Sequence, residues 1–295
     1  MFKTLIGRCI GALGIALAAI TPASARAPSP ALWEVSDPDT TIYLFGTIHL
    51  LPEKYAWQTP RISQAIAGSQ QLVVETIVDD KDPNKLMAAL SSLAFSPGLP
   101  PLRERVPPAQ RAALDAAVAA SGFPAPALDR METWAAAFML LGNQFKDMGL
   151  KTGEGVETVL RQRFISDGKS IGELESNVEQ LGFFDRLSEK AQRDLLLGAI
   201  ERPRDMTKQF SGMLGAWARG DVGAVARSFN RDLANSPELK QALIRQRNLN
   251  WSHWIERRMG QPGTILIAVG AGHLAGDDSL VDMLRREGLK VRRIQ

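Results

Sequence analysis

Short hydrophobic runs near both ends of the chain have the composition of β-strands, whereas the middle is rich in alanine and leucine, as helices are. Two β-rich runs, Ala31–Val35 and Thr41–Phe45, flank the turn-forming segment Ser36–Thr40, which predicts a hairpin. Further strands are predicted at 70–76, 169–175, 264–269 and 289–294. Strand–helix–strand order at both ends predicts an α/β fold, leaning towards α+β, with a mixed central sheet formed by the N- and C-terminal strands.

Helices are predicted to fill the space between these strands. Asp82-Pro83 and Pro107-Pro108 start two of them, and a proline-rich loop from Phe123 to Ala127 precedes a third, from Met131 to Met148. The other helices are predicted around 61–68, 157–168, 177–200, 204–234, 237–259 and 277–287. The segments at about 83–148 and 177–259 are therefore expected to form a large helical insertion packed on the sheet.

The first 25 residues have the pattern of a secretory signal peptide, which leaves 26–295 as a single domain. Lys3 and Arg8 supply positive charge, Ile10–Ile20 is a short apolar stretch, and Ala23-Ser-Ala25 is a small-residue cleavage site. A membrane span needs about 20 apolar residues, so an uncleaved anchor is the weaker alternative. We therefore expect an exported protein, periplasmic or secreted, with no stable membrane span after signal cleavage.

Removal of this segment changes what the composition implies. The single cysteine, Cys9, lies within it, which excludes a disulfide and a thiol nucleophile in the mature chain. The number of Lys and Arg residues falls from 35 to 33, because Lys3 and Arg8 are removed, and this nearly equals the 32 Asp and Glu residues. No basic block is interleaved with aromatic residues, so we expect no nucleic-acid partner. The sequence also lacks Gly-x-Ser-x-Gly, His-Glu-x-x-His and a P-loop, which argues against an ordinary serine hydrolase, zincin or nucleotide-binding protein.

Two of the three histidines follow an apolar strand in the same context. Gly46 precedes His49 by three residues, and Gly270 precedes His273 by three residues. Ligands of open α/β sheets bind at the carboxyl ends of strands, where a glycine lets the backbone turn or approach a ligand. One Gly-x-x-His is commonly a loop histidine bonded to backbone. Its repetition leads to the hypothesis that both histidines meet at one site.

Glu75 ends a third apolar strand and would complete a set of metal ligands. Two imidazoles and one carboxylate form a three-ligand set, and catalytic zinc-type sites keep such a set with one position open for water. We therefore predict that His49, Glu75 and His273 bind a divalent metal ion, with manganese, cobalt and zinc as candidates. The glycines assigned to the same ligand-binding turns are Gly46, Gly270 and Gly272.

Three further residues are candidates for the catalytic site. Glu157 begins a predicted helix after a glycine-rich loop. It would serve as a general base or as a further metal ligand; alternatively, it is an acidic residue in the first helical turn that the helix dipole favours. Arg247 and Asn248 lie on a helix face whose other residues are apolar and are expected to be buried. Because a buried charge needs a partner, Arg247 is expected to bind another polar group. Both residues would bond a substrate carbonyl or orient a metal-bound carboxylate; alternatively, Arg247 forms a structural ion pair with Glu75 or Glu157. His253 lies away from this face and is left out of the site.

Glu175 also remains open between two roles. It ends the strand predicted at 169–175, where it would line the crevice. A capping role for the helix that begins near residue 177 is the alternative.

Taken together, these motifs resemble the TraB/GumN family, and they cover nearly the whole mature chain in the right order. The motifs are Trp33-Glu-Val, Leu44-Phe-Gly-Thr-Ile-His49, Val73-Val-Glu75, Gly155-Val-Glu157, Leu174-Glu175 with Glu179-Gln-Leu181, Arg247-Asn248 with Trp251, and Val269-Gly-Ala-Gly-His-Leu274 with Gly276. The family is similar to the Tiki proteases of animals, described as metal-dependent. More remotely, it is similar to erythromycin esterase-like enzymes and ChaN-type haem-iron-binding proteins.

This resemblance implies a mixed α/β fold with the paired Gly-x-x-His histidines and a glutamate at the active site. We therefore expect an exported metal-dependent hydrolase, peptidase-like, that acts on a peptide or another small substrate. Its metal-bound water would be activated with Glu157 or Glu75 as the base and Arg247 or Asn248 at the oxyanion. The alternatives are a non-catalytic protein that binds haem, iron or another ligand, and an accessory regulatory factor with the same fold.

Overall fold

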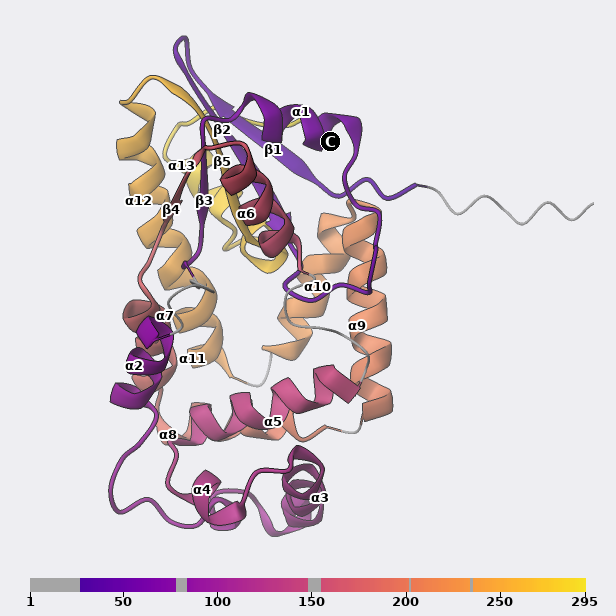
Figure 1. The fold of residues 1–295 in the computed structure, drawn as a ribbon, viewed down its shortest axis with the longest axis vertical. Helices are drawn as coiled ribbons and strands as arrows, with labels where there is room; N and C mark the ends of the chain where they lie inside the picture. Colours follow the sequence, from indigo (N-terminus) through magenta and orange to yellow (C-terminus); the bar gives the residue numbers. More distant parts are fainter. Residues whose placement is uncertain (1–26, 78–83, 148–154, 202, 234–235) are drawn as a thin grey trace, which may run out of the picture.

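The computed structural model of the 295-residue chain describes residues 27–77, 84–147, 155–201, 203–233 and 236–295 (Figure 1). The predicted signal peptide and most of the glycine-rich loop before Glu157 lie outside the described residues.

Six strands of the described chain form one mixed sheet in the order β4-β3-β5-β2-β1-β6. The strands are β1 (Leu32–Ser36), β2 (Thr40–Thr47), β3 (Gln71–Val74), β4 (Ser170–Glu173), β5 (Gly263–Gly270) and β6 (Val291–Arg293). Strands β2 to β5 run parallel, while β1 pairs antiparallel with both β2 and β6. The predicted hairpin and the predicted mixed sheet, built from both ends of the chain, are confirmed.

Strand register brings the ends of three strands to one edge of this sheet. Thr47, near the end of β2, pairs with Gly270 at the end of β5. On the other side of β5, Val74 at the end of β3 pairs with Ala268. The residues that follow these strands therefore leave the sheet side by side, although they come from opposite ends of the sequence.

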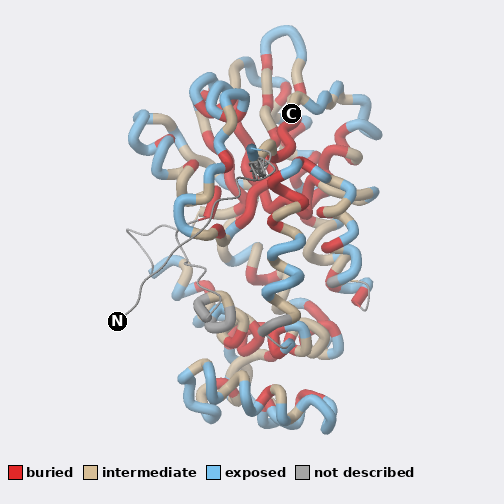
Figure 2. The backbone as a smooth tube through the Cα atoms, turned by 90° about the vertical axis from the view of Figure 1, so that its right-hand side faces the viewer, coloured by how far each residue is buried: buried red, intermediate tan, exposed pale blue. Residues whose placement is uncertain are grey.

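Amphipathic helices bury their apolar faces on both sides of the sheet. One face is covered by α1 (Pro60–Gly68) and α6 (Val156–Ser166), and the other by α12 (Arg247–Met259) and α13 (Leu280–Arg286). In α12, for example, Trp251, Ile255 and Met259 recur every four residues and are buried against the strands. Figure 2 shows the buried residues concentrated in this layered part of the molecule.

The remaining helices lie beyond the edge of the sheet where β2, β3 and β5 end (Figure 1). They are α2 (Asn84–Leu93), α3 (Arg111–Ser121), α4 (Ala125–Asp129), α5 (Thr133–Asp147), α7 (Asn177–Asp185), α8 (Glu189–Ala199), α9 (Pro203–Ala218), α10 (Val222–Asp232) and α11 (Pro237–Lys240). Several of them pack around their own buried clusters, one of which contains Leu114, Leu140 and Leu196. The middle of the chain is thus a helical layer placed against the end of the sheet.

Two details of this layer differ from the sequence prediction. The prediction of a loop at Phe123–Ala127 is wrong in part, because α4 begins at Ala125. A proline early in α4 has no N–H to satisfy and a backbone angle suited to the first helical turn. The long helix expected from Pro237 to Met259 is continuous, but residues Gln241–Gln246 form a π-helical turn directly before Arg247. Such wide turns recur at functional sites, since they redirect the side chains that follow.

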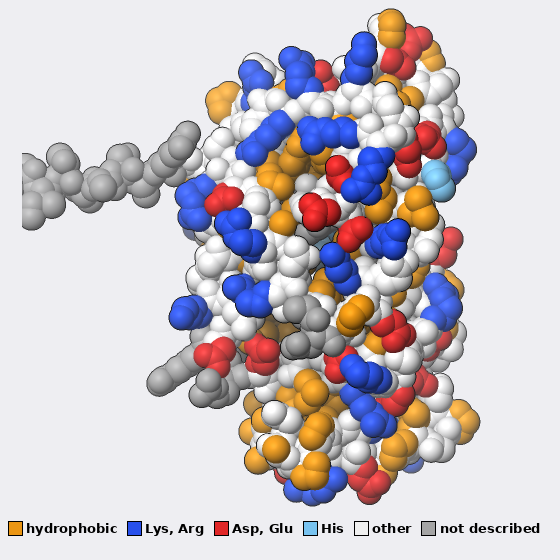
Figure 3. Space-filling model, turned by 180° about the vertical axis from the view of Figure 1, so that it is seen from behind, with side chains coloured by type: hydrophobic (Ala, Val, Ile, Leu, Met, Phe, Trp, Pro, Cys, Tyr) orange, Lys and Arg blue, Asp and Glu red, His pale blue; other side chains and the backbone are white. Residues whose placement is uncertain are grey.

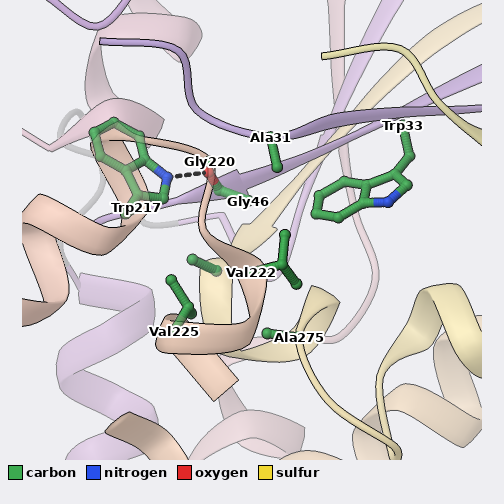
Figure 4. Close-up of a pocket in the computed structure, with 9 residues that line it drawn as sticks. Ala31, Trp33, Gly46, Trp217, Gly220, Val222, Val225 and Ala275 are labelled. Atoms are coloured by element: carbon green, nitrogen blue, oxygen red, sulfur yellow. Dashed lines mark hydrogen bonds between the residues drawn. The ribbon is translucent and has the colours of Figure 1, made fainter. Parts of the chain in front are cut away.

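Helix α9 is fixed to the sheet at the first Gly-x-x-His motif. The indole N–H of Trp217 donates a hydrogen bond of 2.7 Å to the carbonyl oxygen of Gly46. Figure 4 shows this bond beside a small apolar cavity of about 20 Å³. After α9 the chain reverses at Gly220, whose φ of 65° favours glycine, and Asp221 caps α10. The hydrogen bond from Trp217 therefore attaches the helical layer to Gly46, three residues before His49.

The surface carries charges of both signs. Figure 3 shows Lys, Arg, Asp and Glu side chains interspersed on the face seen from behind, with hydrophobic side chains gathered at its lower end over α3 and α4. Within the described ranges, the helices lack the length and apolar character that a membrane crossing requires.

Candidate functional site

The three strand ends carry the three predicted metal ligands into one cavity. His49 follows β2, Glu75 follows β3, and His273 lies in the short helical turn Ala271–Leu274 after β5. The cavity has a volume of about 250 Å³ and is lined by all three side chains. This edge of the sheet is therefore the candidate site.

Gly270 leaves open the point on which these side chains converge. A Cβ atom at Gly270 would lie 3.3 Å from Oε1 of Glu75, 3.5 Å from Nε2 of His49 and 3.7 Å from Cδ2 of His273. The Gly270 N–H also donates a 2.7 Å hydrogen bond to Oε1 of Glu75. A side chain at this position would fill the space between the three groups, which explains the glycine at the end of β5.

Glu157 orients the imidazole of His49. Its carboxylate lies 2.7 Å from Nδ1 of His49 and accepts a second hydrogen bond from the hydroxyl of Thr47. The N–H of Val156 donates to the carbonyl oxygen of Ile48 at 3.1 Å, which draws the start of α6 against the His49 turn. With Nδ1 held, the other ring nitrogen of His49 faces the cavity.

Gly155 makes this approach sterically feasible. A Cβ atom at Gly155 would lie 2.0 Å from the carbonyl oxygen of His49, far closer than atoms pack. Only glycine lets the two backbones come together there. The glycine of the Gly155-Val-Glu157 motif therefore places the carboxylate two residues later.

The ionic state of this pair follows from its charges. The negative charge of Glu157 raises the pKa of His49 to about 9, even though partial desolvation by neighbouring atoms works against the imidazolium. Burial alone would raise the pKa of Glu157, but the His49 charge and the bonds to His49 and Thr47 hold it below its usual value. At neutral pH, without a metal ion, the two groups form an ion pair. The His49 side chain is 67% exposed, so it remains accessible from the cavity.

His273 is held in a defined neutral form by Asn248. The Asn248 amide donates to the carbonyl oxygens of His273 at 3.2 Å and of Asp278 at 2.7 Å, so its own oxygen faces the ring. That oxygen lies 2.8 Å from Nδ1 of His273, which must then carry the proton. Burial lowers the pKa of His273 to about 3. Nε2 of His273 is therefore unprotonated, as in a metal ligand, and accepts a hydrogen bond from Nη1 of Arg247 at 3.2 Å.

Arg247 neutralises the acidic side of the site. Its guanidinium lies 2.6 Å from Oε2 of Glu75, binds Glu175 through two nitrogens, and lies 3.2 Å from Nε2 of His273. Burial alone would raise the pKa of Glu75, but the charge of Arg247 outweighs it and brings the pKa to about 2. Burial is the stronger effect at Glu175 and raises its pKa. The flat guanidinium also packs over the Trp251 ring, at 4.7 Å from its centroid.

The structure places every predicted site residue at or beside this cavity, but with some different roles. Both amide N–H groups of Asn248 are taken by backbone carbonyls, so Asn248 positions His273 instead of meeting an oxyanion. Arg247 pairs with Glu75 and Glu175, not with Glu157. Glu175 fills neither predicted role: it is buried behind the cavity, where it binds Arg247, and the cap of α7 is made by Ser176 and Glu179.

Sequence reasoning assigned no role to Gln180 or Phe229. The Gln180 amide donates to both Glu75 and Glu175, bridging the two carboxylates. Phe229 packs so closely on Gly272 that a Cβ there would lie 2.8 Å from two ring carbons. Gln180 lies in the Glu179-Gln-Leu181 motif, so the sequence did indicate a role for it at the site. Nothing in the sequence around Phe229, an apolar residue of α10, indicated such a role.

The donor set fits a divalent metal ion in kind. It combines a neutral imidazole whose unprotonated Nε2 lies 3.2 Å from the Arg247 guanidinium, a second imidazole whose Nε2 faces the same point, and an ionised carboxylate. The ligand atoms of these residues are more widely spread than those of His253, Glu256 and Glu287. Among the described residues, that exposed group is the one whose ligand atoms all lie within 4.8 Å of one another. His253 itself is exposed, in keeping with its omission from the predicted site.

The fold and the site define an α/β protein with paired strand-end histidines, and the family comparison agrees. The profile of the TraB/PrgY/gumN family matches residues 31–293, so the chain belongs to that family.

The chain is also similar to three curated proteins. It is 26% identical over 245 residues to the uncharacterized protein YbaP of Escherichia coli (strain K12), covering 82% of this chain and 87% of that protein. The same values hold for YbaP of Shigella flexneri. An uncharacterized protein of Treponema pallidum (strain Nichols) is 22% identical over 271 residues, covering 87% of this chain and 80% of the relative. No solved structure matches the chain.

Proposed function

We propose that this protein is a metal-dependent hydrolase that cleaves a peptide or another small substrate at the cavity between the two Gly-x-x-His motifs. The observation that carries the proposal is the convergence of His49, Glu75 and His273 on the open point beside Gly270. Two imidazoles and a carboxylate facing one cavity are a donor set of hydrolytic metal centres.

Each of the chain's own groups has a defined task in this proposal. Glu157 holds Nδ1 of His49, so that Nε2 of His49 faces the substrate space. Asn248 fixes the His273 tautomer, and Arg247 keeps Glu75 ionised and oriented. The Gly270 N–H fixes the other oxygen of Glu75. The site is therefore preorganised, which is the condition for stabilising charge in a transition state.

His49, Glu75 and His273 would hold the metal ion, with manganese, cobalt and zinc as candidates. A bound divalent ion supplies a water molecule of lowered pKa and a Lewis acid for the substrate carbonyl. Without the metal, His49 carries a proton at neutral pH and presents an N–H donor to the cavity.

The experiment that tests the proposal is turnover of a peptide library by the purified protein, with and without a chelator and with each candidate metal restored. We expect turnover that requires metal and is lost in His49→Ala and in His273→Ala. The matched control is His253→Ala, an exposed histidine outside the cavity, which should keep its activity. Turnover that survives both site variants contradicts the proposal. Metal or ligand binding without turnover would instead favour the alternative of a binding protein.

We further propose that the protein is exported to the periplasm or secreted, because its first 25 residues have the signal-peptide pattern. N-terminal sequencing of the protein from fractionated cells should find a chain that begins at residue 26. A chain that keeps its first residues in the cytoplasmic fraction would refute export.

A further inference from the structure

We propose that the cavity contains an apolar subsite that selects substrates with one large uncharged hydrophobic group beside the bond that is cleaved. This inference rests on the proposed function and adds the substrate class. It comes from the side chains that the helical layer contributes to the cavity, which lie outside the ligand set described above.

Apolar side chains from four helical segments line the cavity around the reacting groups. Helix α5 contributes Phe145, helix α9 contributes Phe210 and Met213, helix α10 contributes Phe229, and the π-helical turn before Arg247 contributes Ile244. Ile48 and Leu50, on either side of His49, also line the cavity. A substrate group that enters the cavity to reach His49 must therefore contact hydrocarbon, which favours an apolar group by about 25 cal/mol per Å² buried.

The charges of the cavity argue against a charged substrate group. Among the described residues that line it, the ionisable side chains are His49, Glu75, Arg247 and His273, which belong to the candidate site itself. All four already have hydrogen-bond or ion-pair partners, so a charged substrate group would find no free counter-charge along the apolar lining. Burying an unpaired charge in such surroundings is costly.

The size of the cavity sets the size of the group. Its volume of about 250 Å³ lies just under the roughly 300–1,000 Å³ of typical ligand pockets. One aromatic or branched aliphatic side chain suits this space better than a long hydrophobic segment does.

The apolar wall is held in place relative to the reacting groups. Phe229 is pressed against Gly272, which immediately precedes His273. Trp217 ties α9 to Gly46 of the other motif. Because both Gly-x-x-His turns support the wall, the subsite keeps a fixed position with respect to both histidines.

The test is hydrolysis of N-acetylated amino-acid amides and esters that carry Phe, Leu, Ala, Glu or Lys. We expect kcat/KM for the Phe and Leu probes to exceed that for Ala by at least tenfold, with Glu and Lys lowest. Phe210→Ala and Met213→Ala should each reduce the Phe-to-Ala ratio several-fold. The control is Phe123→Ala, which removes the same side chain from the exposed surface, and circular dichroism checks that each variant folds.

The outcomes separate this inference from the proposed function. Hydrolysis of all probes at similar rates overturns the apolar subsite and leaves the hydrolase intact. Absence of any hydrolysis refutes the hydrolase for this probe class, and NMR titration with N-acetyl-phenylalaninamide and N-acetyl-glutamic acid amide then tests the subsite by itself. Shifts of Phe210 and Phe229 signals with the Phe probe alone support the subsite; no shifts, or equal shifts with both probes, overturn it.

Discussion

The carboxylate of Glu157 lies 2.7 Å from Nδ1 of His49, which joins the first Gly-x-x-His turn to the first turn of α6. This contact gives one histidine of the site a charge and an orientation. The other, His273, receives its orientation from a neutral amide and stays uncharged. The two histidines of matching sequence context therefore occupy opposite protonation states in the metal-free protein.

The charge of His49 predicts a distinct pH dependence. In metal-free protein, the His49 imidazole should titrate near pH 9, and its pKa should be lower in Glu157→Gln, because the carboxylate that raises it most is gone. Because the pKa in the folded chain is the higher one, the stabilising effect is present below pH 6.5 and is lost as pH rises through 9. NMR titration of the imidazole signals, with urea unfolding at pH 6.5 and 9.5, measures both effects. A His49 pKa that is the same in both proteins would contradict the ion pair.

Gly155→Ala should destabilise the protein and separate Glu157 from His49. The added Cβ would meet the His49 carbonyl at 2.0 Å, so the backbone must shift, and overpacking of this kind costs about 1–3 kcal/mol. Gly198→Ala is the matched control. A Cβ at that exposed helical position has open space, and it should raise the free energy of unfolding by about 0.5–1 kcal/mol. Equal stability of the two variants in urea would show that the close approach is not required.

Asn248→Ala should release His273 from its single tautomer. The change removes the hydrogen-bond acceptor of Nδ1 and the donors to two backbone carbonyls, at a cost of about 1–3 kcal/mol in the free energy of unfolding. ¹⁵N NMR should then show a lower fraction of His273 protonated at Nδ1. Asn250→Ala, an exposed change on the same helix, should stay within about 0.5 kcal/mol of the wild type. An unchanged tautomer in Asn248→Ala would refute this positioning role.

Arg247→Met should be among the most damaging single changes at the site. It leaves Glu75 and Glu175 buried without their cation, and loss of one partner from a buried ion pair costs about 3–5 kcal/mol. The loss should shrink in mild acid, where the carboxylates take up protons. Arg245→Met removes an exposed arginine 3.9 Å from Asp278 and should cost no more than about 1 kcal/mol. Similar urea midpoints for the two variants would count against the buried network.

The strands and the pairing of the two motifs could be predicted because their signals are local. Thr41–Phe45 and Thr264–Val269 are apolar, β-branched runs, and each ends in the same Gly-x-x-His pattern. The parallel pairing of β2 with β5 then brings the two patterns together. Glu75 could be placed by the same reasoning, since it ends an apolar strand.

The partners of the site residues could not be predicted, because they depend on side-chain packing between distant helices. The spacing of residues in the sequence does not show that Asn248 donates both amide N–H groups to backbone carbonyls. The choice of Glu175 over Glu157 as a partner of Arg247 depends on where β4 ends. The apolar wall at Phe210 and Phe229 likewise comes from the fold of the helical layer, since apolar helical residues indicate burial but not a cavity.

Elemental analysis of the purified protein and three histidine variants decides whether the two Gly-x-x-His motifs share one metal ion. We predict about one equivalent of a divalent transition metal in the wild type and in His253→Ala, and its loss in both His49→Ala and His273→Ala. His253→Ala is needed because His253, Glu256 and Glu287 form an exposed group that also has suitable ligands. Metal that persists in His49→Ala and His273→Ala but disappears in His253→Ala would contradict a metal site shared by the two Gly-x-x-His motifs.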